Sequence, residues 1–510
     1  MLFRRELIAK IRLEFELWCS LVEAFAPSPF NKESVIYVNF NEFPQHVTPQ
    51  HYQQCIKSRT KMQQEALGFV PNTKTLQEIL FKRNQPQSMD RSAVDAFNGL
   101  STAMGKLYED VYMVADRIHQ QREMVRSHLE NIVSQCDAFP PGTRVLVFGS
   151  SANGFGSPTS DLDMCLQMPP NTKLPGEQDD PTGAKAMGQL AQALESNSMQ
   201  NVDTARLTAR IPIIMFNCPR PMAKEGENEL MECDLSFLNS LAVLNTSLLL
   251  SYSRIHPVTR VLAAIIKRWA KARDINNPSK HTLSSYGYII MLLHFLTYHR
   301  RKGNGLISSL NVEPTSNNPA TFGPLLPNLQ WMDSAWLKTP VGKTPYTELE
   351  RIPMQLIQHP LEEKMVVNTC YHRINHAQEL SELQSRFPSQ DLSLAILLAS
   401  FFRYYAFEFD YKRHVVSLHS TMKRGMVERE IKAEMNGWKV YSTGLAVEDP
   451  FETFYDVAHV VKGSNFHRLR NELALAYTKI INAVESGNAK KGMDLISLIC
   501  ESIEKAEGES

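Results

Sequence analysis

Three aspartates and one glycine–serine pair are the residues of this chain whose types and spacing could do chemistry. Asp161 and Asp163 flank a single apolar residue, so in an extended strand both carboxylates project from one face. Two carboxylates so close repel each other unless a cation lies between them, and hard oxygen ligands suit Mg²⁺ or Mn²⁺. Ten residues separate them from Gly149-Ser150, which follows a predicted buried strand, Arg144 to Phe148. We expect a helix to begin at this pair, so that backbone N–H groups and a hydroxyl cradle a phosphate.

A third acid, Asp234, lies on a second predicted strand, Met231 to Phe237. Polar Glu232, Asp234 and Ser236 alternate there with apolar residues, which is typical of a strand with one buried face. If this strand lies beside the first, Asp234 completes a two-metal site whose ions sit about 3.5–4 Å apart. Such a site steadies both the attacking and the leaving oxygen of an in-line displacement. A lone Asp-x-Asp is usually a solvated turn, but the whole combination is specific.

The combination resembles the DNA polymerase beta-like nucleotidyltransferase superfamily, whose motif is Gly-Ser, a spacer, Asp-x-Asp and a distant strand Asp. Within it, the sequence is similar to noncanonical poly(A) polymerases and terminal uridylyltransferases, which add nucleotides to RNA 3′ ends without a template. The resemblance implies an α+β fold, with a polymerase beta-like palm domain, a largely helical poly(A) polymerase-associated domain and the nucleotide in a cleft between them. It covers roughly residues 121–482, and the stretches that carry it are Asn245–Leu249, Lys267–Arg273, Leu283–Tyr288, Ser393–Asp410 and Val447–Glu452.

The resemblance also implies which residues bind the nucleotide. Ser285 would touch the phosphates and Tyr286 would stack on the incoming base, while Asn245 and Thr246 would lie by the ribose and base. Lys267 and Lys271 share one helix face, and two ammonium groups there suit a triphosphate. Each has an ordinary alternative, namely a core tyrosine, a helix N-cap asparagine or a solvated basic face. The full set expected to bind nucleotide is Gly149, Ser150, Asn245, Thr246, Lys267, Lys271, Ser285, Tyr286, Asp449, Glu452 and Tyr455.

Base choice depends on the stretch from Asp449 to His459. In uridylyltransferases of this family, a His three residues after the Glu of Asp-Pro-Phe-Glu reads uracil; here that position is Tyr455, and His459 replaces a further family Arg. Tyrosine can hydrogen-bond a carbonyl, and its bulk favours the smaller pyrimidine. Asp449 and Glu452 could accept a hydrogen bond from uracil N3–H, directly or through water. We expect UTP as the substrate, with ATP as the alternative.

The expected reaction is attack by an RNA 3′-hydroxyl on the α-phosphorus of UTP, with expulsion of pyrophosphate. Asp161 and Asp163 would hold two Mg²⁺ or Mn²⁺ ions, and Asp234 would bind the catalytic one and help prepare the 3′-oxygen. The alternatives are a poly(A) polymerase that uses ATP, a catalytically inactive RNA-binding scaffold and nucleotidyl transfer to a small molecule. The presence of all three acids argues against the scaffold. The expected partners are an RNA 3′ end and UTP or ATP; the sequence identifies neither the RNA nor a protein partner.

Composition bounds the class of protein. The chain has 510 residues, 43% of them hydrophobic, and 54 basic residues balance 54 acidic ones, so RNA must be held by a local basic surface. We expect RNA to run along basic residues such as Arg254, Arg260 and Arg273. Eight scattered cysteines without C-x-x-C spacing exclude common zinc fingers and favour a reducing compartment. No apolar run approaches the length of a membrane helix, and acidic residues in the first turns argue against a transit peptide. We therefore expect a cytoplasmic enzyme that does not span a membrane, with an organelle as the alternative.

Breaks in helical periodicity and Pro-rich loops suggest the division into domains. The N-terminal extension has no role that the sequence reveals, and buttressing of the fold is the expectation. We expect the extension over residues 1–85, helices that pack on the central domain over 86–128, the catalytic domain over 129–244, a helical central domain over 245–486 with its poly(A) polymerase-associated segment at about 388–450, and a C-terminal tail over 487–510.

Overall fold

The structure is a computed structural model, and it describes two long parts of the chain and several short segments. The long parts are residues 91–298 and 394–485, with gaps at 115, 170–171, 176–179, 181, 210, 224–229, 421–424, 437, 439–443 and 462. The short segments are 325–330, 357–359, 362–367, 369, 371–372, 380–381, 496–497 and 499–500. The expectations for residues 1–85 and for most of the tail, 487–510, therefore lie outside the described residues.

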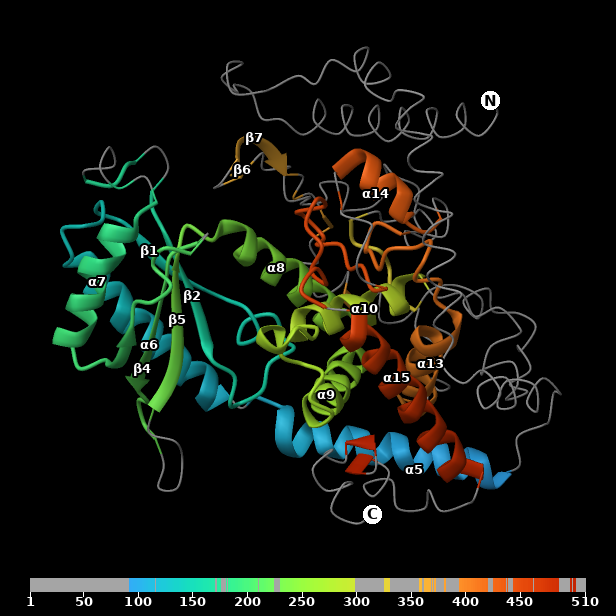
Figure 1. Ribbon diagram of the computed structural model, residues 1–510. Helices are drawn as coiled ribbons and strands as arrows, with labels where there is room; N and C mark the ends of the chain where they lie inside the picture. The colour runs from blue at the N-terminus through green and yellow to red at the C-terminus, as the bar shows by residue number, and fades with distance from the viewer. Residues whose placement is uncertain are drawn as a thin grey trace, which may run out of the picture.

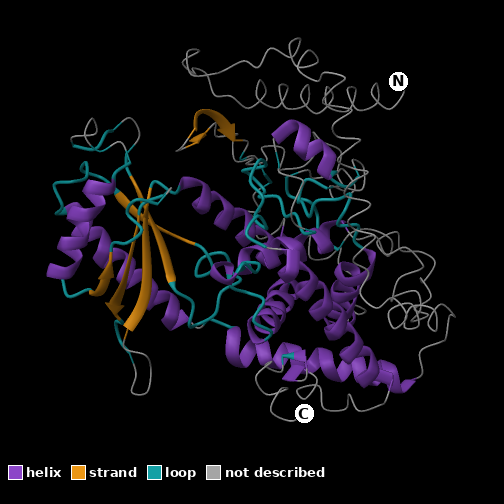
Figure 2. Cartoon of the chain, in the orientation of Figure 1, coloured by secondary structure: helices purple, strands orange, loops and turns teal. Residues whose placement is uncertain are grey.

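A five-stranded sheet forms one half of the molecule (Figures 1 and 2). Its order is β1-β2-β5-β4-β3, and β2 and β5 are parallel while the other neighbours are antiparallel. The strands expected over 144–148 and 231–237 are confirmed. The strands are β1 (Arg144–Phe148), β2 (Leu162–Gln167), β3 (Gln200–Asp203), β4 (Ile213–Pro219) and β5 (Leu230–Phe237).

Two helices, α6 (Asp116–Ser134) and α7 (Ala184–Ser196), lie together on one side of the sheet (Figure 1). Their apolar side chains share one core with alternate residues of the central strands. Because neighbouring strand residues point to opposite faces, Asp163 and Asp234 face away from these helices. The core residues of β2 and β5 are Leu162, Met164, Leu166, Met231, Cys233, Leu235 and Phe237.

The connection into the sheet domain differs from expectation. Helix α5 (Arg91–Leu107) packs on the helical domain, as expected for residues 86–128, but α6 packs on β1 and α7. A π-helical turn, Tyr108–Tyr112, ends the first helix, and Met113 is extended. Val125 and Leu129 of α6 lie at helical spacing on one face, and the sheet buries that face. The boundary between the two domains therefore falls between Tyr112 and Asp116 rather than at 128.

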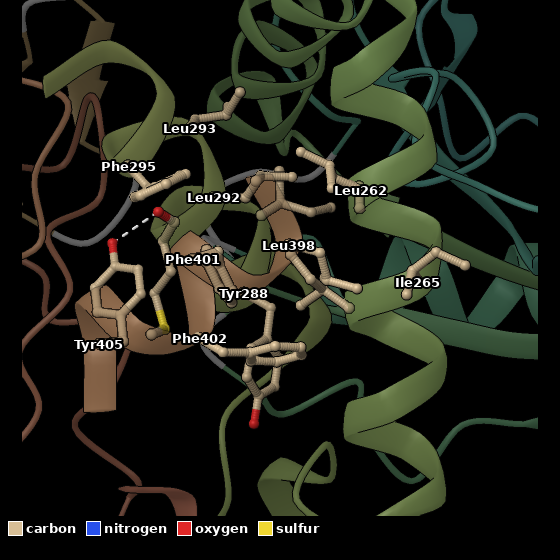
Figure 3. Packing of buried hydrophobic residues seen from close by; sticks show 14 of the residues in the cluster. Leu262, Ile265, Tyr288, Leu292, Leu293, Phe295, Leu398, Phe401, Phe402 and Tyr405 are labelled. Atoms are coloured by element: carbon tan, nitrogen blue, oxygen red, sulfur yellow. Dashed lines mark hydrogen bonds between the residues drawn. The ribbon is translucent and has the colours of Figure 1, made fainter. Parts of the chain in front are cut away.

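Helices dominate the other half of the molecule, and α8 leads into it from the sheet (Figures 1 and 2). Trp269 of α9 packs edge-on against Phe402 of α13, with ring centroids 4.9 Å apart. Figure 3 shows this core, in which the Tyr405 hydroxyl donates to the Met291 carbonyl at 2.7 Å. The main helices are α8 (Ser240–Ile255), α9 (Pro257–Ala272), α10 (Ser285–Tyr298), α13 (Leu394–Arg403), α14 (Arg429–Asn436) and α15 (Gly463–Glu485).

Smaller elements complete this half. A π-helical turn, Tyr404–Glu408, extends α13, and β6 (Ile357–His359) pairs antiparallel with β7 (Glu362–Val367). Residues 411–418 form a turn and isolated bridges. Within the described ranges, no helix has both the length and the apolar character needed to cross a membrane.

Candidate active site

The three predicted acids meet at the parallel pair of strands. Asp163 on β2 is the direct partner of Asp234 on β5, and Asp161 immediately precedes β2. Burial, together with the charges of Asp161 and Asp234, raises the pKa of Asp163 to about 7. Burial and then Asp161 also raise the pKa of Asp234, against an opposing effect of Arg206. The charges of Asp161 and Asp234 therefore lie close enough to Asp163 to disfavour its ionisation, and the charge of Asp161 does the same to Asp234.

This donor set fits a hard divalent cation. Carboxylates are acceptor-only when ionised and are ligands that Mg²⁺ and Mn²⁺ prefer. A cation beside them would favour the ionised forms, which offsets the repulsion that raises the pKa of Asp163. Among the described residues, no three His, Cys, Asp or Glu side chains are arranged closely enough in this structure to coordinate one metal ion.

The glycine–serine pair holds Asp163 instead of opening a helix. Residues 150–154 form turns, which contradicts the expected helix start. Gly149 has a φ of +72°, and a Cβ there would collide with the carboxyl group of Asp163. The backbone N–H of Ser150 donates to that carboxyl group and helps to keep its pKa down. The backbone therefore orients Asp163, one of the three predicted acids, and the Ser150 hydroxyl is the group of this pair that could reach a phosphate.

Thr246 and Asn245, neighbours on α8, do different things. The Thr246 Oγ1 accepts from the Gly149 N–H at 2.8 Å and donates to the Ala242 carbonyl at 2.8 Å, so it braces the turn rather than lying free beside a ribose. Asn245 donates through Nδ2 to Asp449 at 3.3 Å. Its Oδ1 is buried with no hydrogen-bond partner among the described residues. Because α8 begins at Ser240, Asn245 is not the helix N-cap that was its ordinary alternative.

Two lysines of α9 face the sheet domain. Lys267 donates through Nζ to the Phe155 carbonyl at 2.9 Å, which ties the helix to the loop before Asp161. Burial lowers the pKa of Lys267; Asp161 opposes this effect and Lys271 adds to it. Lys271 itself is exposed. Lys267 is therefore close to both the acid cluster and the second lysine, as the i, i+4 spacing predicts.

Asp449 is the centre of a hydrogen-bonded cluster on the base side. It is 3% exposed, and its Oδ1 accepts from the N–H groups of Phe451 and Glu452, both at 2.9 Å. Its Oδ2 accepts from the Tyr286 hydroxyl at 2.9 Å and from Asn245. All four lone-pair positions of the carboxylate are thus occupied by protein donors in this structure. Asp449 orients Tyr286 and Asn245, and its expected hydrogen bond with uracil stays a prediction.

The remaining predicted residues lie around Tyr286. Burial, then Asp449, Glu452 and Tyr455, raise the pKa of the Tyr286 hydroxyl, which shows that these groups lie near it. The ring of Tyr455 packs edge-on against His459, with centroids 5.2 Å apart. Ser285, at the start of α10, accepts from Asn276 Nδ2 at 2.9 Å. The residues expected around the base are therefore gathered in one place.

Two family models match parts of this chain. The family model for the central palm domain of mitochondrial-like poly(A) RNA polymerase matches residues 100–254. The model for Cid1 family poly A polymerase matches residues 393–453. Over both of these stretches the chain resembles the noncanonical poly(A) polymerases and terminal uridylyltransferases. The predicted recognition and the α+β fold with palm and poly(A) polymerase-associated domains are confirmed.

Members with both base preferences are similar to this chain. Terminal uridylyltransferase cid1 of Schizosaccharomyces pombe is 26% identical over 81% of this chain and 88% of that protein. Poly(A) RNA polymerase GLD2 of Mus musculus is 25% identical over 76% of this chain and 66% of that protein. Human terminal uridylyltransferase 7 is 29% identical over 73% of this chain, which spans 20% of that longer protein. A crystal structure of the Cid1 poly(U) polymerase with MgGTP has a TM-score of 0.53 at 24% identity, covering 74% of this chain and 94% of that chain, and shows the shared fold.

The sequence did not predict the contacts of Arg122, the Phe155 carbonyl or the Asn276 amide. The prediction that Arg273 binds RNA fails. Arg122 lies on the buried face of α6 with Ile118 and Val125. A charged residue at the spacing of the apolar face could have been recognised from the sequence as a buried charge. The contact of the Phe155 carbonyl with Lys267 and that of the Asn276 amide with Ser285 could not be predicted from the sequence, because loop residues without a distinctive pattern supply both groups. Arg273, a guess for RNA binding, is buried and pairs with Glu472 at 2.7 Å, so its role is structural.

Proposed function

We propose that this RNA nucleotidyltransferase adds UMP from UTP to RNA 3′ ends without a template. The observation that carries the proposal is the pairing of Asp163 with Asp234 across two parallel strands, with Asp161 one residue away from the first. In the reaction, the RNA 3′-oxygen forms a bond to the α-phosphorus, and the bond from that phosphorus to the bridging oxygen of pyrophosphate breaks. The hydroxyl proton leaves with solvent or a nearby acceptor.

We assign Asp161 and Asp163 to hold two Mg²⁺ or Mn²⁺ ions, and Asp234 to hold the one that serves the attacking 3′-oxygen. Bound there, the cations would lower the pKa of the hydroxyl and neutralise charge that develops on phosphate. The protein's own part is to hold the carboxylates in place. Ser150 N–H and the absence of a side chain at Gly149 fix Asp163, and the strand register fixes Asp234 relative to it.

The triphosphate and ribose are assigned to residues of the helical domain and the Gly-Ser turn. Lys267, Lys271, Ser285 and Ser150 would bind phosphate oxygens, since they supply cations and hydroxyl donors near the acids. Asn245 would read the 2′-hydroxyl, because its Oδ1 is a buried acceptor with no partner among the described residues. A buried acceptor left unpaired costs free energy, which a ribose hydroxyl donor would recover.

The base would stack on the Tyr286 ring, whose hydroxyl is anchored on Asp449 at 2.9 Å. We assign Tyr455 and Glu452, the polar groups nearest Tyr286 in the base-side turn, to the base edge. A carboxylate accepts from uracil N3–H, and a tyrosine hydroxyl donates to a uracil carbonyl. Adenine offers an acceptor at N1 where uracil offers a donor, so a Glu452 carboxylate favours UTP.

Use of ATP is the second candidate, and one observation favours it. Tyr455 stands where uridylyltransferases of the family have their uracil-reading His, and similar proteins include GLD2 poly(A) polymerases as well as uridylyltransferases.

We propose the cytoplasm as the compartment, because the scattered cysteines suit a reducing environment.

The test is extension of a labelled RNA by each of the four ribonucleoside triphosphates separately, in Mg²⁺. A ladder with UTP that an Asp161→Ala/Asp163→Ala variant cannot make supports the proposal. A ladder with ATP and none with UTP would overturn the base assignment and leave the chemistry intact. No extension with any triphosphate would favour the scaffold, and a labelled small product without RNA extension would favour a small-molecule acceptor.

A further inference from the structure

We propose that Arg122 is a positioning residue for the catalytic acids, which acts by clamping the turn that delivers Asp161 to the metal site. The inference rests on the proposed function and extends it to a residue on the far side of the acid cluster from the nucleotide-binding lysines. Arg122 belongs to α6, whose buried residues Val125, Leu129, Ile132 and Val133 form part of the core beneath the sheet. Its side chain is 4% exposed, so it meets neither solvent nor a surface ligand.

The contacts of Arg122 all go to one turn. Its Nη2 donates to the Ser157 carbonyl at 2.9 Å and to the Ser160 carbonyl at 3.1 Å. Ser160 is the residue directly before Asp161. The same turn is closed by its own bond from the Ser160 N–H to the Ser157 carbonyl, at 3.1 Å. One guanidinium group thus holds both ends of the turn that enters the metal motif.

The turn belongs to a loop that two further contacts hold. The Phe155 carbonyl accepts from Lys267, and a Cβ at Gly156 would collide with the Ser150 carbonyl. The loop therefore lies closely against the glycine–serine turn before it reaches Ser157. Between these contacts and β2, Arg122 supplies an anchor from outside the loop.

The energetics favour a functional reason for a charge at this place. The Nε and Nη1 atoms of Arg122 are buried with no hydrogen-bond partner among the described residues, which is costly for a guanidinium group. Burial and then Arg220 lower its pKa, whereas Asp161 favours its charged form. An apolar residue would pack under the sheet without that cost. The guanidinium group of Arg122 instead donates to two carbonyl groups and lies near Asp161.

Loss of the clamp should move Asp161 without disturbing the nucleotide contacts. Asn245, Lys267 and Tyr286 lie on α8, α9 and α10, respectively, and Arg122 donates to none of them. A misplacement of a reacting group by about 1 Å can cost on the order of 100-fold in rate. The expected signature is therefore a lower kcat and weaker cation binding, with the KM for the triphosphate nearly unchanged.

The experiment compares Arg122→Met, Arg122→Lys and a control, Arg117→Met, in the full chain. Lysine keeps the charge and can donate to one of the two carbonyls. Arg117 lies on the same helix but donates to the Met222 carbonyl at 3.3 Å, away from the clamped turn. Two quantities are measured: kcat and KM for the preferred triphosphate, and Mn²⁺ affinity by titration without RNA or nucleotide.

We expect Arg122→Met to lower kcat by about 10- to 100-fold with less than about a threefold change in KM, and to weaken Mn²⁺ binding severalfold. Arg122→Lys should recover much of both losses, and Arg117→Met should match the wild type. The proposal is overturned if Arg122→Met keeps kcat and Mn²⁺ affinity within about twofold of wild type. It is also overturned if Arg122→Lys and Arg122→Met are equally impaired with a shared loss of thermal stability. The Mn²⁺ titration keeps its meaning even if wild type extends no RNA, so failure of the proposed function is distinguishable.

Discussion

The N–H of Gly149 donates to the hydroxyl of Thr246 at 2.8 Å, across 97 positions of sequence. This bond joins the end of β1 to α8, at the place where the sheet domain meets the helices. The adjacent N–H, that of Ser150, holds the carboxyl group of Asp163. Thr246 of the helical domain thus holds the turn that in turn holds Asp163, so the position of this proposed catalytic acid depends on contacts from both halves of the molecule.

Gly149 should not tolerate even a methyl group. In Gly149→Ala, the new Cβ would collide with the Asp163 carboxyl group in a backbone that already has φ at +72°. We expect a loss of kcat of at least about 100-fold in RNA extension, because a reacting carboxylate must move. Gly425→Ala is the matched control, since Gly425 has φ at +83° with open space around it. Equal losses in the two variants would trace the effect to backbone strain alone and contradict the role of the Asp163 contact.

Asp163 should make the metal-free protein less stable as pH rises. Its pKa is raised to about 7, above the ordinary value of 3.8, so the folded state holds a proton that the unfolded state has lost between these values. Stability therefore falls from about pH 4 and the loss is complete above about pH 7, by roughly 1–3 kcal/mol after allowance for partial exposure. Asp163→Asn should flatten this fall and melt at a higher temperature than wild type at pH 8 in EDTA.

The measurement for this prediction is thermal unfolding in EDTA and in Mg²⁺ at pH 5 and pH 8. Added Mg²⁺ should stabilise wild type most at pH 8, where the carboxylate is ionised, and should have little effect on Asp163→Asn. Asp137→Asn, at an exposed site, is the control for loss of an aspartate. A wild-type protein that melts at the same temperature at both pH values in EDTA would count against the mutual repulsion of the three acids.

The acids were predictable from sequence because strand alternation and the Asp-x-Asp spacing fix a face without knowledge of the partner. The pairing of Asp163 with Asp234 was not, since β2 and β5 are distant in sequence and only their register decides it. The helix expected at Gly149-Ser150 failed for a local reason, because Ser150 N–H serves a carboxylate instead of a phosphate.

The base-side residues show a second limit. The sequence places Asp449 in the right motif, but its lone pairs are occupied by Tyr286, Asn245 and two backbone N–H groups. Two of the donors to the Asp449 carboxylate come from α8 and α10, and residue spacing along the chain does not reveal that these helices lie beside it. The same holds for α6, whose periodicity is clear but whose partner, the sheet rather than the helical domain, is decided by tertiary packing.

Asn245 should discriminate ribose from deoxyribose. Its buried Oδ1 has no partner among the described residues, and a 2′-hydroxyl could donate to it. In Asn245→Ala, we expect the preference for UTP over 2′-deoxy-UTP, as a ratio of kcat/KM values, to fall by about 10-fold, or ~1.4 kcal/mol. Ser247→Ala is a neighbouring control on α8, because the Ser247 hydroxyl pairs with Tyr371 at 2.6 Å. An unchanged ratio in Asn245→Ala would assign sugar recognition to another residue.

Tyr455 should contribute to the choice of base through its hydroxyl, because its ring lies near Tyr286 and its position is that of the family's uracil-reading His. Tyr455→Phe keeps the ring and removes the hydroxyl, so the ratio of kcat/KM for UTP to that for ATP should fall by about 3- to 10-fold. Tyr455→His should give a ratio at least equal to that of wild type, since an imidazole N–H replaces the hydroxyl as the donor to a uracil carbonyl. The two variants separate the ring from its polar group. If Tyr455→Phe leaves the ratio unchanged while Tyr455→His raises it, the native tyrosine acts by bulk alone, and Glu452 becomes the residue that must read the base.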